Sequence, residues 1–358
     1  MKQFKLHSFL VALASITLLA SCHKDKVTPA PSKPTAERAG IYVLNQGGIG
    51  HNNSTLTYYD YTSKSLVPDQ FAAANAPGTL GDTGNDLGIY GSKMYIVVNN
   101  SDAIYITTAK TAKQLSKITL HQPRSVVFDK NHAFVTSYDG TVSVIDTTSM
   151  TITKTITVGA DPEQMAIANG KLYVANSGGL LYPDPPTNTL SVIDLATLTE
   201  IKKITVQINP IAVTADAYNN VYVLSLGDFD TKPAGLTIVD ATTDAVKSEP
   251  TVSLGYNIPI YTQGDFVYYP TTTDNKTYQI AVYNAKTQSS ASVNFITDGT
   301  SITTPFSISG DPLTGEIFIG DAKDYASNGT LTAFDKTGKK EYAIATGISP
   351  GKIVLLNK

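Results

Sequence analysis

Acidic and aromatic side chains gather in a few polar segments of the chain, a pattern typical of a binding surface. Asp228, Phe229 and Asp230 are consecutive, and Asp324 is followed directly by Tyr325. A third segment, 177–188, contains Tyr182 and Asp184 among three prolines. Aromatic rings offer apolar contact area to a ligand, and carboxylates orient its polar groups. The alternative is that these segments are polar only because they are exposed loops.

These residues do not form a known catalytic motif. Asp82-Thr83-Gly84 matches the aspartic-protease tripeptide, but that chemistry needs two such carboxylates and the sequence has no second copy. The five histidines lack the paired spacing of zinc hydrolases. We therefore predict no catalytic residue, no cofactor and no metal site. A metal-dependent lactonase or lyase stays a third hypothesis, in which Asp228, Asp321 and Asp324 would hold calcium.

Composition and charge narrow the class of protein. The chain carries 27 Lys and Arg against 30 Asp and Glu, a formal net charge of −3, which lacks the basic footprint of a nucleic-acid binder. It has 20 Tyr and no Trp, and long runs of helical period are missing. This composition favours an all-β protein. A body of more than 300 residues exceeds one ordinary core, but a repeat array grows by adding units.

The N-terminus has the pattern of a bacterial lipoprotein signal. Lys2 and Lys5 precede an apolar stretch too short to span a bilayer, and Leu19-Ala20-Ser21 leads into Cys22, the one cysteine of the chain. We predict a signal peptide over 1–21, lipidation of Cys22 and a Pro-rich tether over 22–39. An ordinary secretory signal is the alternative. The expected location is the outer membrane, lipid-anchored and on the cell surface, with a periplasm-facing position as the other option.

A proline-led unit recurs along the rest of the chain. Pro123, Pro162, Pro210, Pro259, Pro305 and Pro350 are separated by about 39 to 49 residues. In the copy from Pro162, Met165-Ala166-Ile167 predicts an inner strand, Asn169-Gly170 a hairpin turn and Leu172-Tyr173-Val174 a second strand. Residues 189–193 and 201–206 predict two further strands. Four antiparallel strands in a unit of this period indicate a blade of a β-propeller.

The two ends of the chain complement each other. Residues 40–71 contain three predicted strands with no inner strand before them, and 350–356 is an inner strand with nothing after it. With six complete copies between these fragments, we predict a seven-bladed propeller over 40–358. Its ring would be closed by one blade shared between the N- and C-terminal strands. A linear β-solenoid is the rival, and it predicts no such complementary truncation.

A propeller places the loops between the second and third strands, and the linkers between blades, on one face around the channel mouth. The residues just after each anchor are expected to ring that mouth: Asn85, Arg124, Glu163, Ile211, Ile260, Phe306 and Gly351. Arg124 and Glu163 would form a charged lip or an inter-blade ion pair, and Ile260 and Phe306 an apolar floor or core. The predicted ligand-binding residues are Asn45, Asn99, Arg124, Tyr138, Glu163, Asn176, Tyr182, Asp228, Phe229, Asp321 and Tyr325.

Two groups of residues resemble a known family. KLYVANSGG (171–179) with NTLSVIDLATLTEIKKITV (188–206) is similar to the YVTN-type, YncE-like propeller repeat. The segments at 41–60, 81–101 and 320–339, together with the signal, resemble surface propeller lipoproteins of Bacteroidetes. That group includes the partners of TonB-dependent transporters that capture cobalamin. The resemblance implies a ligand-binding propeller beside such a transporter, with a corrinoid as ligand.

The leading hypothesis is a non-catalytic, monomeric envelope lipoprotein. It would bind a small molecule, cobalamin being the best guess by resemblance, and pass it to a TonB-dependent outer-membrane transporter. It would touch the membrane through its lipid and would not bind nucleic acid. The alternative from another class is a protein-interaction or adhesion scaffold.

Overall fold

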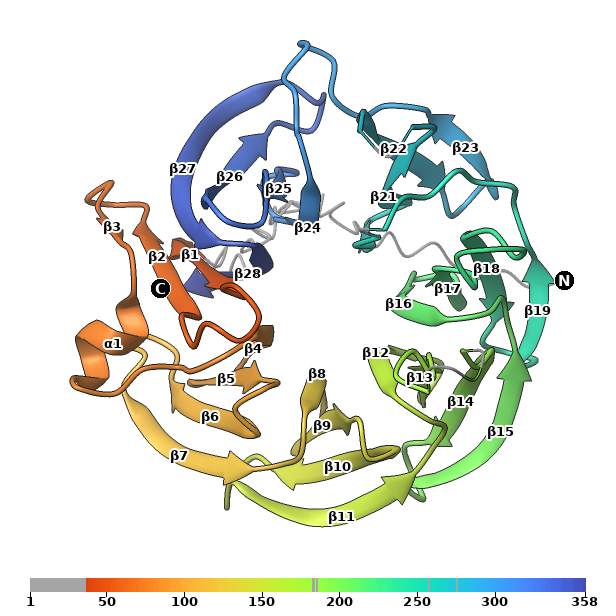
Figure 1. Cartoon of the computed structure of the whole chain (residues 1–358), viewed down its shortest axis with the longest axis horizontal. Helices are drawn as coiled ribbons and strands as arrows, with labels where there is room; N and C mark the ends of the chain where they lie inside the picture. The colour runs from red at the N-terminus through yellow and green to blue at the C-terminus, as the bar shows by residue number, and fades with distance from the viewer. Residues whose placement is uncertain (1–36, 182–183, 185, 257, 275) are drawn as a thin grey trace, which may run out of the picture. The chain divides into compact units, whose positions relative to one another are not determined.

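The computed structural model describes residues 37–181, 184, 186–256, 258–274 and 276–358. Glu37–Lys358 forms one compact unit, in which seven four-stranded antiparallel sheets stand around a central channel (Figure 1). The predicted seven-bladed propeller is therefore confirmed. The predicted signal peptide, Cys22 and nearly all of the tether lie outside the described residues. The unit begins at Glu37, three residues before the predicted boundary.

Each blade runs from an innermost strand beside the channel to an outermost one. Blade 1 consists of β28 (Pro350–Asn357), β1 (Arg38–Asn45), β2 (Thr55–Asp60) and β3 (Leu66–Val67). Blade 2 consists of β4 (Gly84–Tyr90), β5 (Lys93–Val98), β6 (Ala103–Thr108) and β7 (Gln114–Thr119). Blade 3 consists of β8 (Pro123–Asp129), β9 (His132–Ser137), β10 (Thr141–Asp146) and β11 (Thr151–Thr157). Blade 4 consists of β12 (Pro162–Ala168), β13 (Lys171–Asn176), β14 (Thr189–Asp194) and β15 (Thr199–Thr205).

The remaining three blades follow the same order. Blade 5 consists of β16 (Pro210–Ala215), β17 (Asn220–Ser225), β18 (Gly235–Asp240) and β19 (Ala245–Ser248). Blade 6 consists of β20 (Tyr261–Gln263), β21 (Phe266–Thr272), β22 (Tyr278–Asn284) and β23 (Ser289–Ser292). Blade 7 consists of β24 (Pro305–Gly310), β25 (Ile317–Asp321), β26 (Asn328–Phe334) and β27 (Lys340–Ile348). Five of the six anchor prolines begin an inner strand, where a missing backbone N–H is tolerated.

The ring is closed by pairing the two ends of the chain. β28 lies antiparallel to β1, with Val43 opposite Ile353 and Tyr42 opposite Val354. Figure 1 shows β28 at the blue end of the colour scale beside β1 at the red end. This contact joins the last strand of the chain to the first, so both of the open edges that a linear array would have are paired. The structure thereby excludes the linear solenoid.

Apolar side chains fill the wedges between neighbouring blades. Seven clusters of buried residues in the described unit each span one inter-blade interface. In six of the seven blades the second strand carries a fully buried aromatic: Tyr42, Tyr95, Phe134, Tyr173, Tyr222 and Phe318. The repeated Tyr or Phe of the sequence motif is thus a core residue, and it holds the blades at a fixed angle.

One short helix interrupts the strands of the described unit. α1 (Gln70–Asn75) follows blade 1, and the Asp69 carboxylate accepts a hydrogen bond from the Ala72 backbone N–H at 3.1 Å. Its buried Phe71 meets Tyr105 edge-on at 5.0 Å between ring centroids. We did not expect this helix from the sequence. Among the described residues, no helix has the length and apolar character needed to cross a bilayer.

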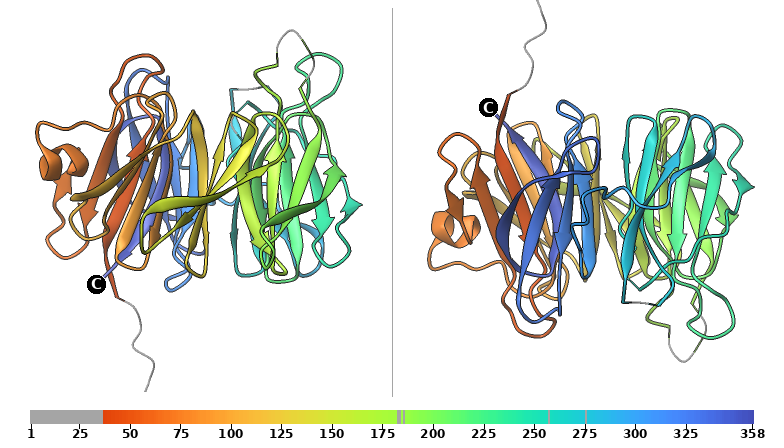
Figure 2. Two further views of the ribbon diagram at one scale, coloured as in Figure 1. Left: turned by 90° about the horizontal axis from the view of Figure 1, so that it is seen from below. Right: turned by 90° about the horizontal axis from the view of Figure 1, so that it is seen from above.

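The two faces of the propeller carry different features. We call the face with the second-to-third-strand loops and the inter-blade linkers the loop face, and the opposite one the terminal face. On the terminal face the Lys358 backbone N–H donates to the Glu37 carbonyl at 2.9 Å. Both side views in Figure 2 place the C-terminus opposite the longest loops. The described chain therefore starts and ends on the face away from the predicted binding residues.

Because β28 closes the ring, its buried contacts are expected to control stability. Replacing the buried Ile353 with Ala should lower the free energy of unfolding by about 2–5 kcal/mol, measured by urea denaturation. The exposed Val293, replaced with Ala, is the control and should change it by about 0.5 kcal/mol or less. Equal effects of the two substitutions would contradict a closing role for β28.

Candidate functional site

The central channel is the cavity around which the predicted site is built. It has a volume of about 570 Å³ and is lined by the innermost strands of all seven blades. The residues expected to ring it all line it: Asn85, Arg124, Glu163, Ile211, Ile260, Phe306 and Gly351. Their predicted position is confirmed, whereas a role in ligand binding stays a prediction.

One wall of the channel, from blades 2 to 4, is polar. Arg124 donates from Nε to a carboxylate oxygen of Glu163 at 2.8 Å, and its Nη2 is also 2.8 Å from that oxygen. The same guanidinium donates to the Asn85 amide oxygen and lies 4.8 Å from the centre of the Tyr138 ring. The Tyr138 hydroxyl donates to the other oxygen of Glu163. The predicted inter-blade ion pair is therefore present, and it belongs to a four-residue network.

Burial and charge tune this network. Burial, the largest single effect, disfavours the charged guanidinium, but Glu163, Tyr138 and Asp86 together outweigh it and raise the pKa of Arg124. Burial, followed by the negative charge of Glu163, raises the pKa of Tyr138 well above its ordinary value. Arg124 thus stays cationic and Tyr138 stays a neutral hydrogen-bond donor throughout the physiological range. The polar wall presents fixed donors and acceptors to whatever enters the channel.

Asp86 is a second polar centre that the sequence analysis missed. Its carboxylate accepts hydrogen bonds from the Ser125 hydroxyl at 2.9 Å and the Val126 N–H at 2.8 Å. The Lys352 ammonium lies 2.9 Å from its other oxygen. The available signal was a carboxylate directly after Asn85, at the start of an inner strand. Asp86 ties blades 1, 2 and 3 together beside the channel.

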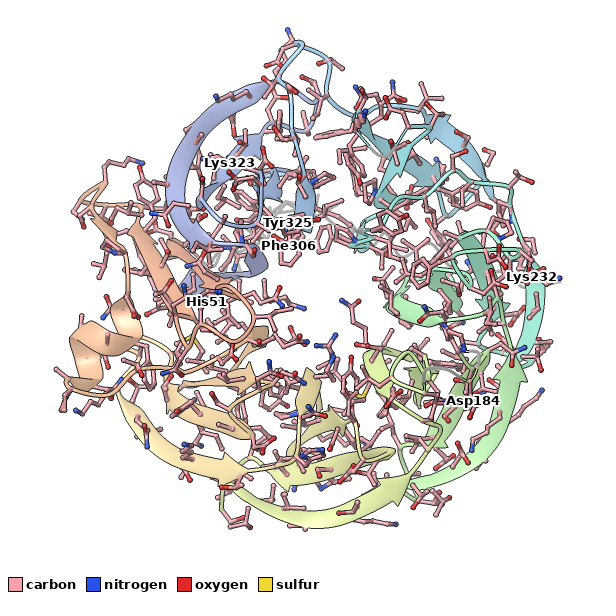
Figure 3. The ribbon with its side chains drawn as sticks, viewed as in Figure 1. His51, Asp184, Lys232, Phe306, Lys323 and Tyr325 are labelled. Carbon is pink, nitrogen blue, oxygen red and sulfur yellow. The ribbon has the colours of Figure 1, made fainter. Side chains whose placement is uncertain are left out.

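The wall formed by blades 5 to 7 is apolar and aromatic. It contains Ile211, Ile258, Ile260, Tyr256, Tyr261 and Phe306. The Tyr325 ring stands edge-on to Phe306 with 6.0 Å between centroids, and Figure 3 shows the two together beside the channel. Phe229 and Tyr256 are also paired, at 5.9 Å. Tyr256 was missed because it lies in the long linker 249–260, outside the repeated strand motif.

Three loops of this wall are each organised by one aspartate. Asp228 accepts hydrogen bonds from the backbone N–H groups of Lys232 (2.7 Å) and Asp230 (3.0 Å), which lower its pKa to about 2. Asp324 is held in the same way by the N–H groups of Ser327 and Ala326, and its pKa is also lowered to about 2. Asp274 repeats the arrangement in blade 6. These carboxylates fix loop conformation.

Several predicted binding residues are instead buried at the ends of second strands. Asn45 donates to Thr55 and Thr57, and Asn99 donates to the Pro123 carbonyl at 3.2 Å. Asn176 accepts from the Gly159 N–H at 3.0 Å, and Asp321 accepts from the N–H groups of Thr303 and Thr304. These four side chains are almost fully buried and hydrogen-bonded within the fold, and their role in ligand binding stays a prediction.

The other predicted residues lie at the mouth or outside the described chain. Arg124, Glu163 and Tyr138 come together on the polar wall. Phe229 and Tyr325 do not line the channel themselves but contact Tyr256 and Phe306, which do. Tyr182 lies outside the described residues. Figure 3 places Asp184 and Lys232 on the far side of the ring from Tyr325 and Phe306, and His51 on the same side as these two.

Carboxylates outnumber lysines in the loops of the loop face. The acidic residues there include Asp82, Asp102, Asp139, Asp161, Asp184, Asp228, Asp230, Asp274 and Asp324, and the lysines are Lys232, Lys276 and Lys323. The mouth is thus surrounded by net negative charge, which favours neutral or cationic ligands over anions. No group of three or more His, Cys, Asp or Glu side chains within the described residues is arranged to hold a metal ion.

Comparisons with known proteins agree with this fold. Residues 39–346 match the family described as a domain of unknown function (DUF5074). No curated protein matches the sequence significantly. Hydrazine synthase of Kuenenia stuttgartiensis is similar in structure, with a TM-score of 0.64 and 15% identity over 79% of this chain and 99% of that chain.

Two further solved structures show the same architecture. A quinonprotein alcohol dehydrogenase-like protein of Bacteroides thetaiotaomicron has a TM-score of 0.62 and 18% identity over 89% of this chain and 78% of that chain. The computationally designed Ika8 protein has a TM-score of 0.58 and 13% identity, covering 90% of this chain and 98% of that chain. At such identities the likeness concerns the fold alone.

The buried Arg124–Glu163 pair leads to a stability prediction. Glu163→Leu should lower the free energy of unfolding by about 3 kcal/mol, because it leaves the guanidinium without its carboxylate partner. The double variant Arg124→Leu/Glu163→Leu should recover most of that loss in urea denaturation. Lys358→Ala, which removes an exposed ion pair with Glu37, should cost about 1 kcal/mol or less. If the double variant were as unstable as Glu163→Leu, the loss of stability would not come from the unpaired charge of Arg124.

The aspartate-organised loops give a pH prediction. A pKa lowered on folding contributes stability above the unfolded pKa and loses it as the pH falls through the folded value. The loops built on Asp228 and Asp324 should therefore keep their conformation at pH 4 and lose it towards pH 2. The backbone amide signals of Lys232 and Ser327 in NMR spectra report this change. In an Asp228→Asn variant the Lys232 signal should no longer titrate, and a wild-type midpoint near pH 4 would contradict the assignment.

Proposed function

This chain belongs to the DUF5074 family, and we propose that it is a non-catalytic cell-envelope lipoprotein that binds a small molecule at the channel mouth. In this proposal the ligand is captured on the loop face and passed to an outer-membrane transporter. The lipid on Cys22 would hold the protein at the membrane. A YncE-like, surface-lipoprotein relationship is part of the same proposal, and it rests on the sequence resemblance.

The observation that carries the proposal is the two-sided chemistry of the mouth. Arg124, Glu163 and Tyr138 provide polar groups on one wall, and Phe306 and Tyr256 provide apolar area on the other. A cavity of about 570 Å³ that combines an apolar wall with fixed polar groups is of a size that binds small molecules. Because the ring is closed, little ordering of the backbone would accompany binding.

The state of the channel carboxylates supports binding rather than catalysis. Glu163 is held by Arg124 and Tyr138, and Asp86 by Lys352, Ser125 and a backbone N–H. A general base or nucleophile must reach the reacting atom itself. These two acids are committed to partners within the fold.

The orientation of the unit supports capture and hand-over. Glu37, through which the chain leaves the propeller toward Cys22, lies on the terminal face beside Lys358. The aromatic and acidic loops lie on the opposite face. A lipid-anchored protein built in this way would present its binding loops away from its own attachment point.

A corrinoid is the proposed ligand, by the resemblance described above. Such a macrocycle has a broad apolar face and a rim of amides, which match the aromatic and polar walls in kind. It is larger than the channel, so it would lie across the mouth with only part of it entering.

A protein partner is the second candidate, and exposed apolar side chains on the loop face favour it. Ile49, Leu180 and Leu181 are exposed large apolar residues in two of its loops. Such residues are enriched where proteins bind one another. In the leading proposal this partner is the transporter, and in the alternative the protein is only a scaffold or adhesin.

Calorimetry with cyanocobalamin tests the proposed ligand. The chain from residue 23 onward, which keeps the whole described unit, should bind it with a dissociation constant in the micromolar range or below. Tyr138→Phe removes the hydroxyl oxygen, which can accept a hydrogen bond from a ligand amide while its proton is donated to Glu163, and should weaken binding by about five- to tenfold, the cost of one hydrogen bond.

Thr153→Ala on the outer strand β11 is the control and should bind as the wild type does. Absence of heat at micromolar protein would reject the corrinoid. If the heat of binding is the same for Tyr138→Phe and the wild type, the ligand binds away from the polar wall.

A further inference from the structure

Two loops of the aromatic wall share one construction. In blade 5 Asp228 accepts backbone hydrogen bonds and is followed by Phe229, and in blade 7 Asp324 does so and is followed by Tyr325. Both aromatic residues have left-handed backbones, with φ of +62° and +64°. Non-glycine residues seldom adopt that region, and bulky ones do so least. The fold thus holds two rings in a disfavoured conformation at matching places.

Both rings are exposed although each has an aromatic neighbour. Phe229 is 62% exposed and Tyr325 46% exposed. Phe229 is supported by Tyr256, and Tyr325 by Phe306. In a turn with only a structural role, burial of the ring would be the main contribution that offsets the energetic cost of the strained backbone. Here Phe229 is mostly exposed and Tyr325 about half exposed.

Tyr278 lies in the same region as the two pairs. Burial raises the pKa of Tyr278, and Tyr325, Asp274 and Tyr256 add to the shift. A Cβ at Gly255 would collide with the Tyr278 ring, so the backbone lies directly against it. We call the two pairs, together with Tyr278, the aromatic arc: Phe229, Tyr256, Tyr278, Tyr325 and Phe306.

From this geometry we propose that Phe229 and Tyr325 are the stacking residues of the site, and that they select a ring-bearing ligand without net negative charge. The inference deepens the proposed function and rests on it for the position of the site. Ring faces carry negative charge density, and the surrounding loops add carboxylates. Neutral and cationic rings are therefore attracted to the aromatic arc, and anionic rings are repelled.

Asp228 and Asp324 act in this proposal as positioning residues. Each accepts two backbone hydrogen bonds that close the loop behind its ring. In blade 5 the turn also needs Gly227, whose φ is +75° and where a Cβ would collide with the Lys232 carbonyl oxygen. The loops are therefore shaped before any ligand arrives.

Saturation-transfer NMR with three probes of similar shape and different charge tests the selection. The probes are benzyltrimethylammonium, benzyl alcohol and benzoate, each at millimolar concentration with the chain from residue 23 onward. The cation and the alcohol should give signals, and benzoate should give none. A benzoate signal as strong as that of the cation would overturn the charge selection.

Substitutions locate the contact. Phe229→Ala/Tyr325→Ala should reduce the cation signal at least about fivefold. Tyr218→Ala is the matched control, because Tyr218 is an exposed aromatic on the terminal face and its loss should leave the signal unchanged. A double variant that keeps the wild-type signal, with an unchanged circular-dichroism melting curve, would overturn the assignment of the stacking residues.

The positioning role has its own test. Asp324→Ala should weaken the cation signal with Tyr325 still present, and Asp324→Asn, which keeps an acceptor oxygen, should restore most of it. Asp240→Ala removes a comparable turn aspartate on the terminal face and should have no effect. Equal signals from Asp324→Ala and the wild type would remove the positioning role.

The calorimetric test separates this inference from the proposed function. If the neutral and cationic probes bind but cyanocobalamin does not, the corrinoid is rejected and the aromatic arc is kept. If cyanocobalamin binds the Phe229→Ala/Tyr325→Ala variant as tightly as the wild type, the proposed function is kept and the aromatic arc is rejected.

Discussion

The pairing of β28 with β1 is the constraint on which the rest of the structure depends. It brings residues more than 300 positions apart into register, and so converts a row of similar blades into a ring. Once the ring is closed, side-chain contacts link the inner strands at the other junctions too. Lys352–Asp86, Arg124–Glu163, Thr214–Thr262, and Tyr261 with the Gly310 carbonyl are examples. The channel is the space that these contacts leave.

Equivalent positions in the ring carry different chemistry, and this difference creates the candidate site. The residue just after each anchor is Asn85, Arg124 or Glu163 in blades 2 to 4, but Ile211 or Phe306 in blades 5 and 7. The backbone places all of them beside the channel in the same way. Blade geometry thus determines where a ligand would lie, and individual side chains determine what kind of ligand it would be.

The sequence predicted the fold well because the signals are local and repeated. The proline-led inner strands and the complementary ends located the channel ring, including Arg124 and Glu163, before any coordinates were known. The site was predicted less well where partners are distant in the chain. The sequence suggests that Asn176 is a loop residue, but its amide oxygen accepts a hydrogen bond from the Gly159 N–H in the preceding inter-blade linker. Tyr256 lies in a linker outside the repeat, so periodicity gave no reason to choose it.

The turns of the terminal face show what an aspartate-organised loop requires. Asp194 and Asp240 each accept two backbone N–H bonds there, but the next residue, Leu195 or Ala241, is buried. The left-handed residue in those turns is Leu198 or Asp244, at the far end. In the two loops built on Asp228 and Asp324, the aromatic residue that follows the aspartate is itself left-handed and exposed. The hydrogen bonds of such a turn can therefore form without an exposed ring. The turn alone does not account for the exposure of Phe229 and Tyr325.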